Sequence, residues 1–242
     1  WLLTQGMHCC DVALFYPASA VQAELSVPLS SYHDYLSAWR ESPFSPQSRS
    51  EPAKEIARVF WEIAGNVSWR WHGVVRRDDR VRWQGALEKT GQDFDVIDED
   101  SLARAEIYDG RLQVSGEAYH VLIFPQTTHL PRAALEQAWS LVQDGGLVAF
   151  VGCAPTSTCE GGADDPNLHH LLRALLGERG SGREHESGGA AALLPDADAL
   201  AAWLNARLTP PVRGEVRALH RRVEDMGVYL IIPDRLAPPP PE

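Results

Sequence analysis

The sequence lacks the features that would place it in a membrane or on a nucleic acid. No apolar run approaches the roughly 20 residues needed to span a bilayer. Positive charge is scarce, with 22 Lys and Arg against 33 Asp and Glu and a net charge of -11. Binding to phosphates or to an anionic lipid surface needs concentrated positive charge, so neither partner is expected. Hydrophobic residues make up 44% of the chain, which is ordinary for a globular protein with a core.

Both ends of the chain lack the usual signals. The first residues, Trp1 to Gly6, contain no initiator Met, no basic segment and no small-residue cleavage site. The last residues, Pro238 to Glu242, are proline-rich and predict no folded ending. We therefore expect an internal segment of a larger protein. The compartment stays unassigned, because the parent protein fits a cytoplasmic, periplasmic or secreted location equally well.

Cofactor and metal motifs are also missing. No glycine-rich phosphate-binding loop follows the first predicted strand. His169 and His170 are adjacent, so on a helix they point about 100° apart and cannot chelate one ion together. The four cysteines are Cys9, Cys10, Cys153 and Cys159. Their spacing does not match a zinc knuckle, and we predict neither a cofactor nor a metal site.

Short continuous apolar runs predict buried strands. They cover residues 11–16, 94–97, 120–124 and 147–151. Runs of this length that end at Pro or Gly suit the centre of a parallel sheet. Helical spacing of apolar residues predicts helices over 32–40, 52–64, 133–142, 168–176 and 196–208, and another that ends near Lys89. The alternation predicts an α/β fold with helices on both faces of the sheet, and a strand order of 2-1-3-4 would make it flavodoxin-like, as in class I glutamine amidotransferases.

Two further stretches predict antiparallel strands. Asp109-Gly110 separates 105–108 from 112–114, and this pair favours a tight hairpin turn. Residues 212–222 and 226–232 form two extended runs joined by a short polar turn. We place a boundary at 209–211. The sequence thus predicts an α/β domain over 1–208 and, over 209–242, a strand pair that opens a β domain, with a proline-rich tail.

Acidic residues gather around the second predicted strand. They are Asp93, Asp95, Asp98, Glu99 and Asp100. Glycosidic cleavage needs two carboxyl groups about 5–10 Å apart, and strand ends are the usual site location in open α/β sheets. Acidic residues also occur at helix N-termini for structural reasons. Both interpretations stay open, and no catalytic residue is assigned.

Cys153 follows a buried strand through Gly152, a placement similar to that of a nucleophile elbow. An amidotransferase elbow would have a glycine two residues after the cysteine, where Pro155 stands. Its His-x-Glu pair would come later, but Glu184-His185-Glu186 has the wrong spacing. An active amidotransferase is not predicted, and a cysteine-dependent hydrolase remains a third hypothesis.

Tryptophan is abundant, with eight in 242 residues. Those between the first two predicted strands include Trp61, Trp69, Trp71 and Trp83. Aromatic faces stack on sugar rings, although ordinary core packing explains such residues as well. Trp69 and Trp71, with Asp98 and Glu99, are our candidates for contact with a sugar or with another domain.

Several segments, taken in order, resemble one family. They are Gln5-Gly6 with Asp11 to Pro17, Asp93 to Glu99, Tyr119 to Pro125, Gly145-Gly146 with Val151-Gly152, and Leu219 to Arg222 with Val228-Tyr229. The family is that of the α-L-rhamnosidase-like glycoside hydrolases (glycoside hydrolase family 106 and relatives), in their amidotransferase-like α/β middle domain. The chain departs from it at Cys9-Cys10 and near Tyr229, where an Asn usually follows.

The resemblance implies a role for the chain. In such enzymes the α/β domain follows a catalytic (β/α)8 barrel, which is expected to hold the catalytic carboxylates and the metal ligands. The leading hypothesis is therefore a non-catalytic segment of a bacterial glycoside hydrolase, whose parent acts on a polysaccharide or glycoside. The alternative is an oligomerisation or carbohydrate-binding module of a β-galactosidase-like enzyme.

Overall fold

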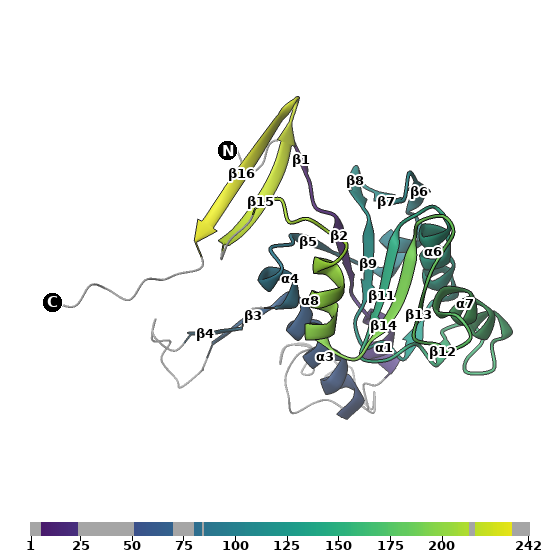
Figure 1. The fold of residues 1–242 in the computed structure, drawn as a ribbon. Coiled ribbons are helices and arrows are strands. Elements are labelled where there is room, and N and C mark those ends of the chain that lie inside the picture. Colours follow the sequence, from purple (N-terminus) through teal and green to yellow (C-terminus); the bar gives the residue numbers. More distant parts are fainter. Residues whose placement is uncertain (1–5, 24–50, 70–79, 84, 213–215, 234–242) are drawn as a thin grey trace.

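The computed structural model describes residues 6–23, 51–69, 80–83, 85–212 and 216–233 (Figure 1). Its centre is a six-stranded sheet in the order β13-β14-β11-β9-β2-β5. In that order the strands are Gly182–Glu184, Ala190–Leu194, Leu147–Val151, Val121–Phe124, Val12–Phe15 and Phe94–Ile97. All neighbours are parallel except β13, which pairs antiparallel with β14. The four predicted strands are confirmed in the predicted order, because β5 lies beside β2, followed by β9 and β11.

The central strands β2, β9 and β11 are buried on both faces. This explains why their sequences show apolar runs without alternating polar residues. Successive side chains point to opposite faces of the sheet, so Ala13 and Phe15 enter one core while Val12 and Leu14 enter the other. The sheet is therefore the middle layer of three.

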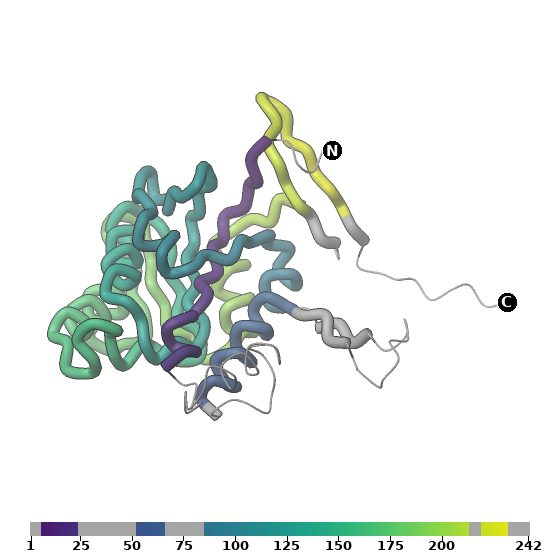
Figure 2. Tube along the Cα trace, turned by 180° about the vertical axis from the view of Figure 1, so that it is seen from behind, coloured from purple at the N-terminus to yellow at the C-terminus, as the bar shows by residue number. Residues whose placement is uncertain are grey.

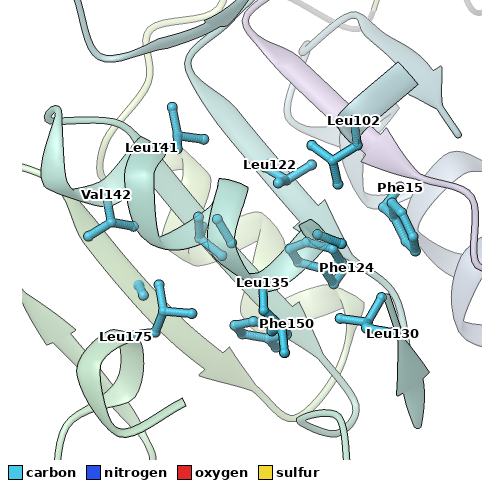
Figure 3. Close-up of a cluster of buried hydrophobic side chains, with 14 of the residues drawn as sticks. Phe15, Leu102, Leu122, Phe124, Leu130, Leu135, Leu141, Val142, Phe150 and Leu175 are labelled. Atoms are coloured by element: carbon cyan, nitrogen blue, oxygen red, sulfur yellow. The ribbon is translucent and has the colours of Figure 1, made fainter. Parts of the chain in front are cut away.

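Three helices cover the first face: α5 (Glu99–Ala103), α6 (Arg132–Gln143) and α7 (Pro166–Leu176). Figure 3 shows the core beneath them, where leucines from the helices meet a row of phenylalanines from the strands. The Phe124 ring lies 5.0 Å from that of Phe15 and stacks at 5.1 Å on that of Phe150. This aromatic row joins three neighbouring strands.

Three other helices cover the second face: α3 (Glu51–Ala64), α4 (Ala86–Lys89) and α8 (Ala197–Asn205). Their apolar side chains, such as Ile63, Leu87 and Leu200, pack on Leu14 and Ile123 of the sheet. The short helix α1 (Ala18–Ala23) follows β2 and contacts α3. Two small two-stranded sheets lie apart from the central sheet: β10 (His129–Leu130) with β12 (Ser157–Thr158), and β3 (Asn66–Trp69) with β4 (Arg80–Trp83).

The predicted turn at Asp109-Gly110 is confirmed. It joins β6 (Glu106–Tyr108) to β7 (Arg111–Val114), and both turn residues have positive φ angles, 53° and 66°. A second turn of the same kind, at Ser115-Gly116, leads into β8 (Glu117–Tyr119). Two-residue hairpin turns with positive φ at both positions match the twist of the strands that they join.

The structure differs from the sequence-based expectations in several places. It adds β14 as a fifth parallel strand and β8 as a third strand of the small antiparallel sheet. The helix expected to end near Lys89 is short, and the strand β4 precedes it. The helix expected over 32–40 lies outside the described residues.

The C-terminal strand pair is confirmed as β15 (Val216–Val223) and β16 (Met226–Pro233). A third strand, β1 (Met7–His8), pairs with β15, so that His8 lies opposite Arg221. Figures 1 and 2 show that this hairpin projects beyond the central sheet, and that the chain runs from β1 directly into β2. Strand β1 lies in the predicted first domain, 1–208, but pairs with a strand of the predicted second one. The boundary at 209–211 stays a prediction. Among the described residues, no helix has the length and apolar character that crossing a bilayer would require.

The Phe124 ring provides a test of the core. We expect Phe124→Ala to lower the free energy of unfolding by about 3–5 kcal/mol, because it leaves a cavity between two other rings. Urea denaturation followed by circular dichroism measures the change. Tyr108→Ala is the matched control, since Tyr108 is 72% exposed and its removal should cost little. Equal losses for the two variants would contradict this description of the core.

Candidate functional site

A cluster of polar side chains lies at the amino-terminal edge of the parallel sheet. Cys10 comes just before β2, and Asp93 and Asp95 stand at the start of β5, which pairs with β2 from Val12 and Phe94 onward. His8, the last residue of β1, lies close to them because only three residues separate β1 from β2. The parallel register thus brings together side chains more than 80 residues apart in the sequence.

His8 lies between two carboxylates. Its Nε2 is 2.7 Å from Asp93 Oδ2 and its Nδ1 is 2.9 Å from Asp95 Oδ2, while its backbone N–H donates to Glu117 Oε1 at 3.2 Å. The hydrogen bond to Asp93, followed by that to Asp95, raises the pKa of His8 to about 12. The His8 side chain is only 12% exposed. Because it is largely buried and has a carboxylate partner at each ring nitrogen, the His8 imidazole is held in one orientation.

Asp95 Oδ2 is the centre of the cluster. Besides His8 it accepts a hydrogen bond from the Tyr119 hydroxyl at 3.0 Å and one from Cys10 Sγ at 3.4 Å. Burial opposes ionisation of Asp95, but these hydrogen bonds, first that from His8, outweigh it and lower its pKa. Burial is the main cause that raises the pKa of Cys10, to about 11, and also the main cause that raises the pKa of Tyr119. Without a further ligand, the thiol and the phenol are therefore protonated at neutral pH.

Two cavities open onto this cluster. One of about 510 Å³ is bordered by His8, Cys10 and Asp93, and the other, of about 550 Å³, by His8, Asp95 and Tyr119. The surrounding strands β1, β8 and β15 contribute their walls. Small solutes can reach the cluster from both sides.

The acidic residues around the second strand do not form one group. Asp93 and Asp95 lie at the amino end of β5, whereas Asp98 and Glu99 follow its carboxyl end, five residues and about 16 Å of extended chain away. Asp93 and Asp95 therefore do not lie at the carboxyl end of the strand, the usual site location in open α/β sheets, because β5 separates them from Asp98 and Glu99.

Asp98 and Glu99 have structural partners at the carboxyl edge. The Asp98 carboxylate caps α5 by accepting from the Ser101 backbone N–H at 2.7 Å. Glu99 accepts from the backbone N–H of Ser19 at 2.8 Å and from its hydroxyl at 2.5 Å, which links α5 to α1. These contacts agree with the structural interpretation of acidic residues at a helix start. A contact of Asp98 or Glu99 with sugar or with another domain stays a prediction.

The tryptophan candidates are only partly described. Trp69 ends β3, but its side chain is outside the described set, and Trp71 lies outside the described residues altogether. Trp61 packs edge-on against Phe60 at 5.1 Å, beside the second core. Trp61 is thus a packing residue, while the roles of Trp69 and Trp71 stay predictions.

Cys153 follows β11 through Gly152, which has a φ of 89°. Burial raises the pKa of Cys153, whereas a nucleophilic cysteine needs a lowered one. His185 is the histidine that the sequence analysis considered as the catalytic base. It packs against Trp139, and one of its ring nitrogens faces the Leu175 carbonyl. This geometry disfavours the cysteine-dependent hydrolase.

The amino-edge cluster was missed by sequence reasoning. The sequence feature that could have indicated it is a pair of polar residues two positions apart near the start of each strand: His8 and Cys10 before β2, and Asp93 and Asp95 at β5. Residues two apart in extended chain point to the same side. Recognising the cluster also requires knowing that β5 pairs with β2, which the spacing alone does not tell.

Comparison with solved structures gives a likeness over nearly the whole chain. A rhamnosidase from Novosphingobium sp. PP1Y matches 95% of this chain with a TM-score of 0.50 and 15% identity. Gan42B, a GH42 β-galactosidase, matches 92% with a TM-score of 0.47 and 12% identity. This chain covers 17% of the rhamnosidase and 34% of the β-galactosidase. At such low identity the likeness to the rhamnosidase concerns the fold.

Searches by sequence gave no match to any protein-family profile or to any curated protein.

A buried carboxylate on the other side of the molecule offers a test of the electrostatics. Asp165, whose side chain is 1% exposed, accepts from the Thr158 hydroxyl at 2.6 Å and from Arg132 at 2.8 Å. The bond from Thr158, followed by that from Arg132, lowers its pKa to about 2. A carboxyl group with a lowered pKa stabilises the fold above its unfolded value, near 3.8, and loses this effect as the pH falls toward 2.

We therefore expect Asp165→Asn to be less stable than the parent chain at pH 7, and expect the difference to shrink between pH 4 and pH 2. Chemical denaturation at a series of pH values measures it. Asp164→Asn, at the exposed neighbouring position, is the control and should behave like the parent chain. A difference that stays constant down to pH 2 would exclude the ionised carboxylate as the cause.

Proposed function

We propose that this chain is the α/β domain of a bacterial glycoside hydrolase related to the rhamnosidases of glycoside hydrolase family 106, with a flavodoxin-like, amidotransferase-like layout. In this proposal the domain supports a catalytic barrel elsewhere in the parent enzyme, and the carbohydrate substrate binds there. The observation that carries it is the structural likeness to a rhamnosidase over 95% of this chain. The family motifs found in the sequence support the same assignment.

The engagement of the carboxylates supports a non-catalytic role. Glycosidic cleavage needs two carboxyl groups that face each other across the bond, about 5–10 Å apart. Asp93 and Asp95 instead bind opposite nitrogens of one imidazole. Asp98 caps a helix and Glu99 holds Ser19. An acid or nucleophile that already serves such a contact is poorly placed to exchange protons with a substrate.

One observation favours the second candidate, an assembly module. The hairpin carries exposed apolar side chains, with Met226, Tyr229 and Ile231 all at least 45% exposed. Exposed apolar residues on a projecting element are typical of surfaces that contact other domains or subunits. Such a surface also suits contact with the barrel of the parent enzyme.

The proposal predicts that residues 1–242 alone will not hydrolyse aryl α-L-rhamnosides or aryl β-galactosides above the buffer rate. The measurement is release of the chromogenic phenol by the purified, folded chain. The coding DNA beside this segment should encode, in the same reading frame, a barrel with two carboxylates suited to glycosidic cleavage. Turnover by the isolated chain that disappears in Asp95→Asn or Glu99→Gln would overturn the non-catalytic assignment.

A further inference from the structure

Three side chains of the amino-edge cluster form a set of metal-binding donors. They are His8, Cys10 and Asp95, and one ligand atom from each lies within 4.8 Å of the others. Imidazole nitrogen, thiolate sulfur and carboxylate oxygen are together the ligand types that zinc takes in proteins. We infer that these three residues bind one divalent transition-metal ion, with zinc the best match.

Two of the three distances between the donors are close to those that a tetrahedral ion requires, and the third, between His8 and Cys10, is within 4.8 Å. Zinc bonds of about 2.0–2.3 Å place neighbouring ligand atoms roughly 3.4–3.6 Å apart. Cys10 Sγ already lies 3.4 Å from Asp95 Oδ2. His8 Nδ1 lies 2.9 Å from the same oxygen and must move away by about half an ångström. There is room for this movement, because cavities lie beside the side chains of His8 and Asp95.

The hydrogen bonds around the donors are those of a supported metal site. His8 turns its other nitrogen, Nε2, toward Asp93 at 2.7 Å. Once Nδ1 has given up its proton, this carboxylate–histidine pairing keeps the remaining proton on Nε2, so that Nδ1 can bind the ion. The Tyr119 hydroxyl holds the Asp95 carboxylate at 3.0 Å. Each of these two donors thus has a partner that orients it.

Binding replaces protons with the metal. In the structure, His8 Nδ1 and Cys10 Sγ both lie within hydrogen-bonding distance of Asp95 Oδ2. When the ion binds, the proton on Cys10 Sγ and the proton on His8 Nδ1 leave to solvent, and three bonds from these ligands to the ion form. Water from a neighbouring cavity completes the fourth position. Affinity therefore rises with pH.

The ion would fasten the C-terminal hairpin to the central sheet. His8 belongs to β1, which pairs with β15, while Cys10 and Asp95 belong to the edge formed by β2 and β5. A metal bond across this junction restrains the hairpin relative to the sheet. This inference concerns structure and does not depend on the glycosidase assignment.

The test is a zinc titration of the metal-depleted, reduced chain by calorimetry, with cobalt as a spectroscopic probe. We expect one zinc per chain, a thiolate-to-cobalt charge-transfer band, and a rise in the thermal unfolding midpoint with zinc. Cys10→Ser should weaken zinc binding by more than roughly tenfold and abolish the band. Asp93→Asn, which changes only the partner of His8, should weaken binding by roughly 10–100-fold.

The adjacent cysteine supplies a matched control. Cys9 Sγ contacts the Met7 carbonyl and has no place in the donor set, so Cys9→Ser should leave zinc affinity and the cobalt band unchanged. Circular dichroism checks that every variant is folded. The inference is overturned if the folded parent chain binds no zinc, if Cys10→Ser binds it as tightly as the parent, or if Cys9→Ser loses the band.

Discussion

One carboxylate oxygen, Asp95 Oδ2, receives contacts from an imidazole and a thiol of one segment, His8 and Cys10, and from the phenol of Tyr119, more than 100 residues away in the sequence. A partly buried anion is costly without such partners, so the position of each partner is constrained by the others. Through His8 the constraint extends to β1 and the C-terminal hairpin. Through Tyr119 it extends to β8 and the strand β9 that follows it. Asp95 thus links strand β1, which pairs with the hairpin, to the central sheet.

The location of the cluster bears on its role. In open parallel sheets, substrates bind at the carboxyl ends of the strands. Here His8 and Tyr119, whose pKa values are both raised, lie with Asp95 at the opposite, amino-terminal edge. At the carboxyl edge, Asp98 and Glu99 instead serve helices α5 and α1. Both arrangements agree with the proposed non-catalytic role of this chain.

The sequence predicts the central sheet well, because a strand buried on both faces leaves a continuous apolar run such as Val121–Phe124. Strand β14 could not be predicted in this way. Its sequence is rich in alanine, which is not typical of strands, and it acquires its place by pairing with β11. The cluster at the amino-terminal edge could not be predicted for a related reason. Spacing shows that His8 and Cys10 share one side, but only the register between β2 and β5 brings Asp95 to them.

The most direct measurement of the central claim is anomalous diffraction at the zinc absorption edge, from crystals of the reduced chain grown with zinc. We expect a peak bonded to His8 Nδ1, Cys10 Sγ and Asp95 Oδ2, with His8 Nε2 still paired with Asp93. Density that shows His8 directly hydrogen-bonded to both aspartates, with zinc bound only elsewhere, would contradict it.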